Sequence, residues 1–176
     1  MPNLLTVDEL KAVMAHAPDH CRWALDVEYN TGCRPGETEL LKLKFSDVSW
    51  ETNEITIRGT KTGERKVSLK PDFMTRLRNA YEKADSDYVI TYKGKPIKRL
   101  QKSFNTALKK AGIKKRVRLY DLRHMYGTLM AKNKADIFAL QKLMGHADIQ
   151  TTKNYLHHAE DLKEDAVNNC LPGLDS

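Results

Sequence analysis

The sequence has 176 residues, of which 40% are apolar and 30% charged, and a net charge of +7. This length suits one domain that buries its core without disulfide or metal support, and no apolar run approaches the roughly 20 residues that a membrane-spanning helix needs. The cysteines at positions 21, 33 and 170 show neither CxxC nor Cys/His ligand spacing, so we expect no disulfide framework, no metal site, no membrane segment and a cytoplasmic location.

Two helices are expected at the start of the chain. Thr6 and Glu9 have the spacing of a capping box, in which each side chain satisfies a backbone amide of the other at a helix start. A second helix carries Trp23 and Val27 at helical spacing and ends at Gly32.

A change of period marks a small sheet in the next segment. Pro35 followed by Glu37 first predicts a short third helix that carries Leu40 and Leu41. From Asp47 onward, apolar residues alternate with polar ones on either side of a turn, which predicts antiparallel strands; the alternating residues are Ile55, Ile57, Val67 and Leu69.

The second half of the chain returns to helical periodicity. The expected helices follow Pro71, cover residues 98–110, begin near Asp121, lie between Asp136 and Gly145, and cover about 159–170. The predicted fold class is therefore α+β and mostly helical, with helices around a small three-stranded antiparallel sheet, in one domain over residues 1–176.

Positive charge is concentrated in one part of the chain. Between Lys93 and Arg118 there are eleven Lys or Arg residues and no Asp or Glu. Such a one-signed surface suits nucleic acid, because neutralising phosphates releases condensed counterions; a solvated surface stretch is the alternative. The candidate DNA-binding residues in this block are Lys98, Arg99, Lys102, Lys114, Lys115, Arg116 and Arg118.

Two arginines near predicted helix starts suggest an anion site. Arg34 and Arg123 each lie where backbone amides and the helix dipole favour negative charge. Two guanidiniums aimed at one place repel each other unless an anion lies between them, and a phosphate fits their planar donors. Taken singly, Arg34 could instead pair with Glu37 one turn away, and His124 could be a packing residue.

Five short motifs, taken in their order along the chain, resemble the signature of the tyrosine recombinase, or phage integrase, family. The family pattern has an arginine in a TG-x-R-x-x-E stretch, a lysine on a β-hairpin, an H-x-L-R-H stretch, an L-G-H stretch and a tyrosine shortly after. His146 and Tyr155 are nine positions apart, a spacing similar to that of the family. The matching residues here are Arg34 with Glu37, Lys61, Arg123 with His124, His146 and Tyr155.

The resemblance implies a DNA-cleaving and DNA-joining enzyme. Tyr155 would attack a backbone phosphorus and form a 3′-phosphotyrosyl bond, so no nucleotide cofactor would be needed. Arg34 and Arg123 would stabilise the transition state, and His146 would add another donor. Lys61 would protonate the departing 5′ oxygen, so no metal would be required. Glu37 would orient Arg34 without contacting the DNA itself.

Tyr120 departs from the family pattern. It occupies the position of the first histidine in H-x-L-R-H, and a phenol can donate a hydrogen bond but accepts a proton poorly at neutral pH. We expect Tyr120 to be a phosphate donor rather than a base. His157 and His158 beside the tyrosine have no third partner in the sequence, so we interpret them as exposed residues and not as metal ligands.

Two other functions stay open at this point. A type IB topoisomerase uses the same phosphotyrosine chemistry, and an inactive DNA-binding module would keep the basic surface. The resemblance also implies a specific double-stranded DNA site and a homotetramer on DNA. An N-terminal DNA-binding domain is expected to be absent, and residues 159–176 are expected to dock on this molecule or on a neighbour.

Overall fold

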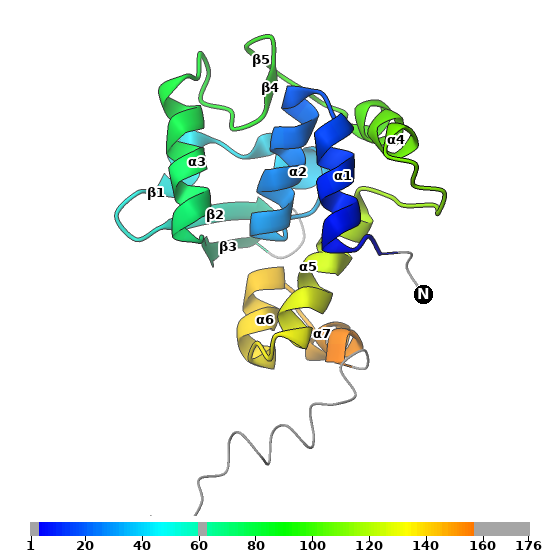
Figure 1. The fold of residues 1–176 in the computed structure, drawn as a ribbon. Coiled ribbons are helices and arrows are strands. Elements are labelled where there is room, and N and C mark those ends of the chain that lie inside the picture. The colour runs from blue at the N-terminus through cyan, green and yellow to red at the C-terminus, as the bar shows by residue number, and fades with distance from the viewer. Residues whose placement is uncertain (1–3, 60–62, 157–176) are drawn as a thin grey trace, which may run out of the picture. The chain divides into compact units, whose positions relative to one another are not determined.

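The computed structural model describes residues 4–59 and 63–156 of the chain (Figure 1). These residues form helices and a small antiparallel sheet, which confirms the predicted fold class. The chain divides into two compact units, residues 1–126 and 127–176, which are described separately below. No helix in the described part of the chain is long and apolar enough to cross a membrane.

Helices α1 and α2 open the N-terminal unit, and the start of α1 and the end of α2 lie where the sequence predicts them. Helix α1, Val7–His16, starts with the expected capping box, in which Thr6 and Glu9 accept hydrogen bonds from each other's backbone amides. Helix α2, Asp19–Thr31, ends at Gly32, whose positive φ of 61° suits glycine. Helix α1 also packs against α2 and α4 (Figure 1).

The predicted third helix is replaced by short 3₁₀ turns. Turn η1 covers Gly36–Thr38 and turn η2 covers Leu40–Lys42, and Glu39 between them has non-helical backbone angles. The expectation of one continuous helix was wrong because the Glu39 carboxylate turns back to accept the Arg34 backbone N–H, 2.7 Å away. A further turn, η3, covers Phe45–Asp47.

The predicted sheet is three-stranded and antiparallel, in the order β1-β2-β3. Its strands are Val48–Ser49, Glu54–Gly59 and Gly63–Ser68. Ile55 pairs with Val67, and both are buried in the core. Ile57 pairs with Arg65, so an arginine occupies a position on the core-facing side of β3.

The remaining elements of the N-terminal unit include a hairpin that the sequence pattern did not indicate. Helix α3 covers Pro71–Glu82. Strands β4, Thr91–Tyr92, and β5, Lys95–Pro96, pair around a two-residue turn at Lys93 and Gly94, both with positive φ. Helix α4 covers Gln101–Lys110 and so begins three residues later than expected.

Helix α5, Tyr120–Lys132, begins in the N-terminal unit and ends in the C-terminal one. Helix α6, Ile137–Met144, is capped by Asp136 and closed by Gly145, as predicted. Helix α7, Ile149–Leu156, was not predicted. The helix expected over about 159–170 lies outside the described residues.

Candidate active site

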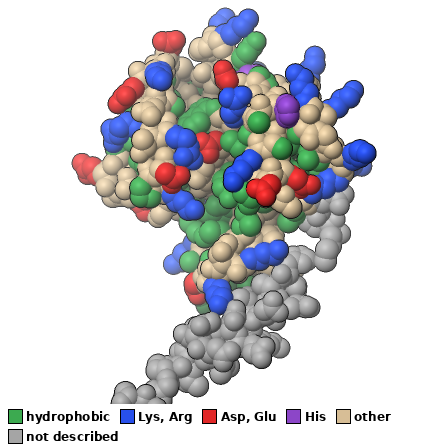
Figure 2. All heavy atoms as spheres, viewed as in Figure 1, with side chains coloured by type: hydrophobic (Ala, Val, Ile, Leu, Met, Phe, Trp, Pro, Cys, Tyr) green, Lys and Arg blue, Asp and Glu red, His purple; other side chains and the backbone are tan. Residues whose placement is uncertain are grey.

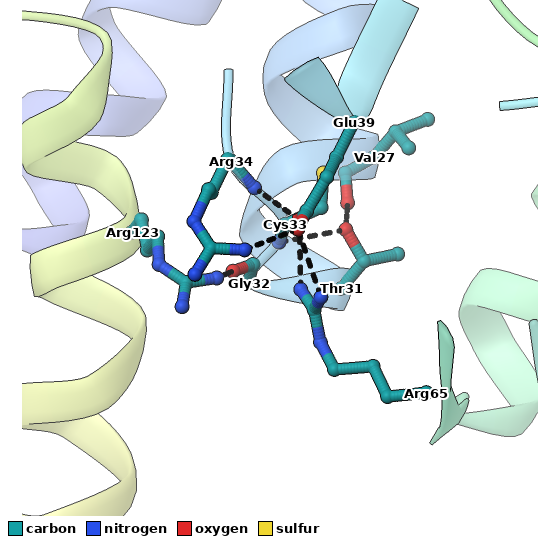
Figure 3. Close-up of polar contacts among 8 residues, drawn as sticks. All are labelled: Val27, Thr31, Gly32, Cys33, Arg34, Glu39, Arg65 and Arg123. Carbon is teal, nitrogen blue, oxygen red and sulfur yellow. Dashed lines mark hydrogen bonds and ion pairs between the residues drawn. The ribbon is translucent and has the colours of Figure 1, made fainter. Parts of the chain in front are cut away.

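A buried carboxylate binds two arginines in the N-terminal unit (Figure 3). Glu39, only 1% exposed, accepts hydrogen bonds from Arg34 Nη1 at 2.5 Å and from the two Nη atoms of Arg65 at 2.9 and 2.8 Å. Because Glu39 also accepts the Arg34 backbone N–H, the side chain and the backbone of Arg34 are held by one group. The arrangement fixes the direction of the Arg34 guanidinium.

The expected partner of Arg34, Glu37, does not have this role in the structure. Glu37 is exposed in turn η1, whereas Glu39 lies buried two residues later and makes the contacts. The prediction failed because it assumed helical geometry after Arg34, in which residue i+3 comes back to the same face. The 3₁₀ turns place residue i+5 there instead.

Arg123 brings a third guanidinium to the same region. It lies in the first turn of α5 and is 1% exposed, and its Nη1 donates to the Gly32 carbonyl at 2.7 Å. Burial lowers the pKa of Arg123, and the charges of Arg34 and Arg65 lower it further. Arg34 and Arg65 lower this pKa more than Glu39 and Tyr120 raise it, so positive charge is in excess around Arg123 and an anion placed there would be stabilised.

The acidic groups near the arginines do not remove this excess. Burial raises the pKa of Glu39, but hydrogen bonds from Arg65 and the Arg34 backbone, with the charges of both arginines, outweigh burial and bring it to about 2. Glu39 is therefore ionised at neutral pH. Glu28 is fully buried, and burial raises its pKa well above the ordinary value although the Arg123 charge opposes this, so Glu28 is a poor counter-charge. Three guanidiniums thus surround one ionised carboxylate.

Tyr120 and His124 lie on either side of Arg123 in the first turns of α5. Their rings meet edge to face with centroids 5.0 Å apart. Tyr120 is 39% exposed, while His124 is half-buried and burial lowers its pKa. Tyr120 therefore has the exposure that a donor to a ligand needs, and His124 is a neutral packing partner.

In the C-terminal unit, His146 and Tyr155 lie together. Their rings stack with an interplanar angle of 6° and centroids 6.1 Å apart, and Tyr155 is 7% exposed. His146 Nδ1 is 2.9 Å from the hydroxyl of Thr152, which is fully buried on α7. Because Thr152 binds Nδ1, the orientation of the imidazole ring is fixed.

The remaining predicted site residues are Lys61 and the DNA-binding candidates. Lys61 lies outside the described residues, between Gly59 at the end of β2 and Gly63 at the start of β3. Among the DNA-binding candidates, Lys115 binds Glu9 at 2.6 Å and Arg118 binds Asp121 at 3.0 Å. The exposed candidates are Lys98, Arg99, Lys102, Lys114, Arg116 and Arg118.

The basic segment also borders a shallow hollow of about 450 Å³ at the C-terminal end of α4. Its lining includes the apolar side chains of Leu108 and Ile113 and the basic side chains of Lys109, Lys114 and Arg116. Figure 2 shows Lys and Arg side chains gathered on the face that carries α4. The surface of this segment is thus suited to an anionic partner.

The described residues offer little for a metal. Within residues 4–59 and 63–156, no three His, Cys, Asp or Glu side chains gather into a group that could hold a metal ion. Cys21 and Cys33 are free and buried, and burial raises the pKa of Cys21 to about 11, so this thiol stays protonated at neutral pH.

Sequence reasoning missed Glu39, Arg65 and Thr152. A signal for Arg65 was present, because it precedes Val67 and Leu69 at the alternating spacing of one strand face. An arginine on an apolar face needs a buried acidic partner. For Glu39 and Thr152, the sequence held no comparable signal.

The described part of the chain is a mostly helical α+β protein with three arginines near one buried carboxylate and a buried tyrosine stacked on a histidine. The model of the phage integrase family matches residues 3–161, and the chain belongs to this family. Tyrosine recombinase XerA of Pyrococcus furiosus is 33% identical in an alignment of 180 residues, gaps included, that covers 93% of this chain and 60% of the relative. Tyrosine recombinase XerC of Proteus mirabilis is 31% identical over 171 residues, covering 89% and 55%.

Solved structures show the same fold. The crystal structure of XerA recombinase matches with a TM-score of 0.74 and 28% identity, over 98% of this chain and 66% of that one. The catalytic domain of bacteriophage HP1 integrase matches with a TM-score of 0.72 and 22% identity, over 97% of both chains. The chain spans about three fifths of the length of the curated relatives it matches.

Proposed function

We propose that residues 1–176 act as the catalytic domain of a site-specific tyrosine recombinase, which cleaves and rejoins DNA through a covalent phosphotyrosine. The observation that carries this proposal is the buried cluster of Arg34, Arg65 and Arg123 around one ionised carboxylate. Such a cluster suits the phosphodiester of DNA, and the names of the relatives support the same reaction.

Tyr155 is the proposed nucleophile. Its phenol loses its proton to solvent as the oxygen attacks the phosphorus, a bond forms between that oxygen and the 3′ phosphate, and the bond to the 5′ oxygen breaks. Lys61 gives a proton to the departing 5′ oxygen. Attack by the free 5′ hydroxyl of another strand reverses these steps and reseals the DNA, so the reaction needs no external energy source.

Arg34 and Arg123 act on the non-bridging oxygens. The negative charge on these oxygens grows as phosphorus becomes five-coordinate, and guanidiniums fixed in advance stabilise this charge without reorganising. Glu39 and Arg65 are positioning residues, because Glu39 holds Arg34 and Arg65 holds Glu39. Removing either should reduce cleavage more than DNA affinity.

His146 and Tyr120 supply further donors. His146, oriented by the Thr152 hydroxyl at Nδ1, donates to a phosphate oxygen. Tyr120 donates its phenol to the same phosphate, in agreement with its exposure beside Arg123. His124 supports Tyr120 by ring contact and takes no direct part.

The proposed partners are double-stranded DNA at a specific site and, on that DNA, further copies of this chain in a tetramer, with residues 159–176 docking in cis or in trans. The exposed lysines and arginines from Lys98 to Arg118 contact the backbone and give a steep salt dependence. The proposed location is the cytoplasm, where buried free cysteines stay reduced.

The test uses a pool of nicked duplexes with randomised sequence, incubated with the full chain in EDTA. The nick lets the short strand beyond the cleaved bond diffuse away, so a covalent adduct accumulates. We expect a denaturation-resistant adduct with the wild type and none with Tyr155→Phe, and sequencing the trapped DNA identifies the site. If Tyr155→Phe forms as much adduct as the wild type, the assigned nucleophile is wrong. DNA binding without adduct in the wild type would favour an inactive DNA-binding module.

A further inference from the structure

We propose that Gly127 is a positioning residue for the nucleophile, because its missing side chain makes the space in which the hydroxyl end of Tyr155 lies. This inference rests on the proposed function of Tyr155. It concerns the C-terminal unit alone, to which both residues belong.

The geometry is specific to the reacting end of the ring. A Cβ atom at Gly127 would lie 2.7 Å from Tyr155 Cζ, 2.8 Å from Cε1 and 3.0 Å from Cε2. Cζ is the carbon that bears the phenolic oxygen. Since ordinary contacts begin near 3.4 Å, even an alanine methyl would force this end of the ring to move by about 0.7 Å, or would force α5 and α7 apart.

The backbone conformation at Gly127 does not require a glycine. Gly127 lies inside α5 and is absent from the glycines with positive φ among the described residues. In a helix interior, glycine is less favourable than alanine. A residue that weakens its own helix and lies against Tyr155 is best explained by the close approach that it permits.

His146 and Thr152 also restrict the position of the Tyr155 ring. His146 stacks on the Tyr155 ring, and Thr152 holds His146. With these residues and Gly127 fixed, the phenolic oxygen has little lateral freedom. Attack on phosphorus requires the reacting atoms to approach to about 3–3.5 Å in line, and a misplacement of 1 Å can cost about 100-fold in rate.

The first test measures the rate of adduct formation in a single turnover, with DNA that carries the wild-type site. We expect Gly127→Ala to form adduct about 30- to 100-fold more slowly, with DNA affinity within twofold and no loss of thermal stability. Ala131→Gly is the matched control, because it removes a buried methyl group from the same helix and adds none near the tyrosine. We expect this control to react within threefold of the wild type.

A modified substrate separates positioning from proton transfer. When sulfur replaces the bridging 5′ oxygen, the leaving group needs no acid, so this substrate should rescue Lys61→Ala. It should not rescue Gly127→Ala, whose defect lies in the attack itself. Either full rescue of Gly127→Ala or a rate within threefold of the wild type on the ordinary substrate would overturn the inference while leaving the proposed function intact.

A spectroscopic test does not depend on activity. With tyrosine labelled by carbon-13 at Cζ, comparison with Tyr155→Phe assigns the Tyr155 resonance in the full chain. We expect Gly127→Ala to shift this resonance and Ala131→Gly to leave it in place. An unchanged resonance in Gly127→Ala would overturn the inference even if the wild type forms no adduct, an outcome that would by itself reject only the proposed function.

Discussion

The arginine cluster of the N-terminal unit and the tyrosine group of the C-terminal unit are built in opposite ways. Arg34, Glu39, Arg65 and Arg123 come from distant parts of the sequence and are held by charged hydrogen bonds. His146, Thr152 and Tyr155 lie within ten residues and are held by ring stacking and one hydroxyl. The first region therefore depends on charge balance, and the second on the space available to one ring.

The largest expected effect is on the charge balance. Glu39→Gln removes the carboxylate that Arg34 and Arg65 share, and leaving buried charge unpaired costs about 3–5 kcal/mol. We expect that loss in the free energy of unfolding, measured with urea, and loss of adduct formation. Glu37→Gln changes an exposed residue two positions away and should cost less than about 0.5 kcal/mol. Equal losses in the two variants would show that Glu39 is not the centre of the cluster.

Acid should weaken the same cluster. The pKa of Glu39 is about 2 in the folded protein, against 4.5 ordinarily. Because the folded value is the lower one, the stabilisation is complete above pH 4.5 and is lost as pH falls toward 2; it amounts to about 3 kcal/mol. Urea unfolding at a series of pH values should show this loss in the wild type and a smaller loss in Glu39→Gln. Parallel curves would contradict the assignment.

Glu28 is a buried acidic residue of the N-terminal unit whose pKa shifts in the direction opposite to that of Glu39. Its two carboxyl oxygens are buried and have no hydrogen-bond partner among the described residues, and burial raises its pKa. A raised folded-state pKa means that its contribution is most favourable at low pH and becomes less so as pH rises through that value. Glu28→Leu should therefore stabilise the protein by about 1–2 kcal/mol near pH 8 and by less near pH 5. A destabilised variant at pH 8 would show that the ionised carboxylate is needed.

The smallest expected effect is in the tyrosine group. Thr152→Val keeps the volume of the side chain and removes the hydroxyl that binds His146, which should cost about 1 kcal/mol of stability. Adduct formation should slow about tenfold because the imidazole can rotate. Thr151→Val, at an exposed position on the same helix, should leave the rate unchanged. If the two variants react equally, the hydroxyl does not orient His146.

The sequence predicted the local features of the fold well. Thr6 with Glu9, Gly32, Asp136 and Gly145 mark helix ends because capping depends on residues within one turn. Strands β2 and β3 were found from alternation alone, whereas the two-residue strands β4 and β5 are too short to show it. Helix α7 was missed, although it carries the proposed nucleophile, because its eight residues make only about two turns and hold few repeats of an apolar pattern.

Candidate residues for the site could be named from the sequence, but the contacts between them could not. Arg34, Arg123, His146 and Tyr155 follow from motif spacing, and the structure brings the two arginines together in one unit and His146 with Tyr155 in the other. The pairing of Arg34 with Glu39 depends on a 3₁₀ turn, and the contact of Gly127 with Tyr155 depends on how α5 packs against α7. Neither is encoded in a local pattern.

The most direct measurement is the chemical identity of the adduct. After incubation with nicked DNA, nuclease and protease digestion leave a peptide that carries a short nucleotide remnant, and tandem mass spectrometry locates the modified residue. We predict a 3′-phosphate linkage on Tyr155. A remnant on another side chain, or a linkage through a 5′ phosphate, would contradict the proposed mechanism.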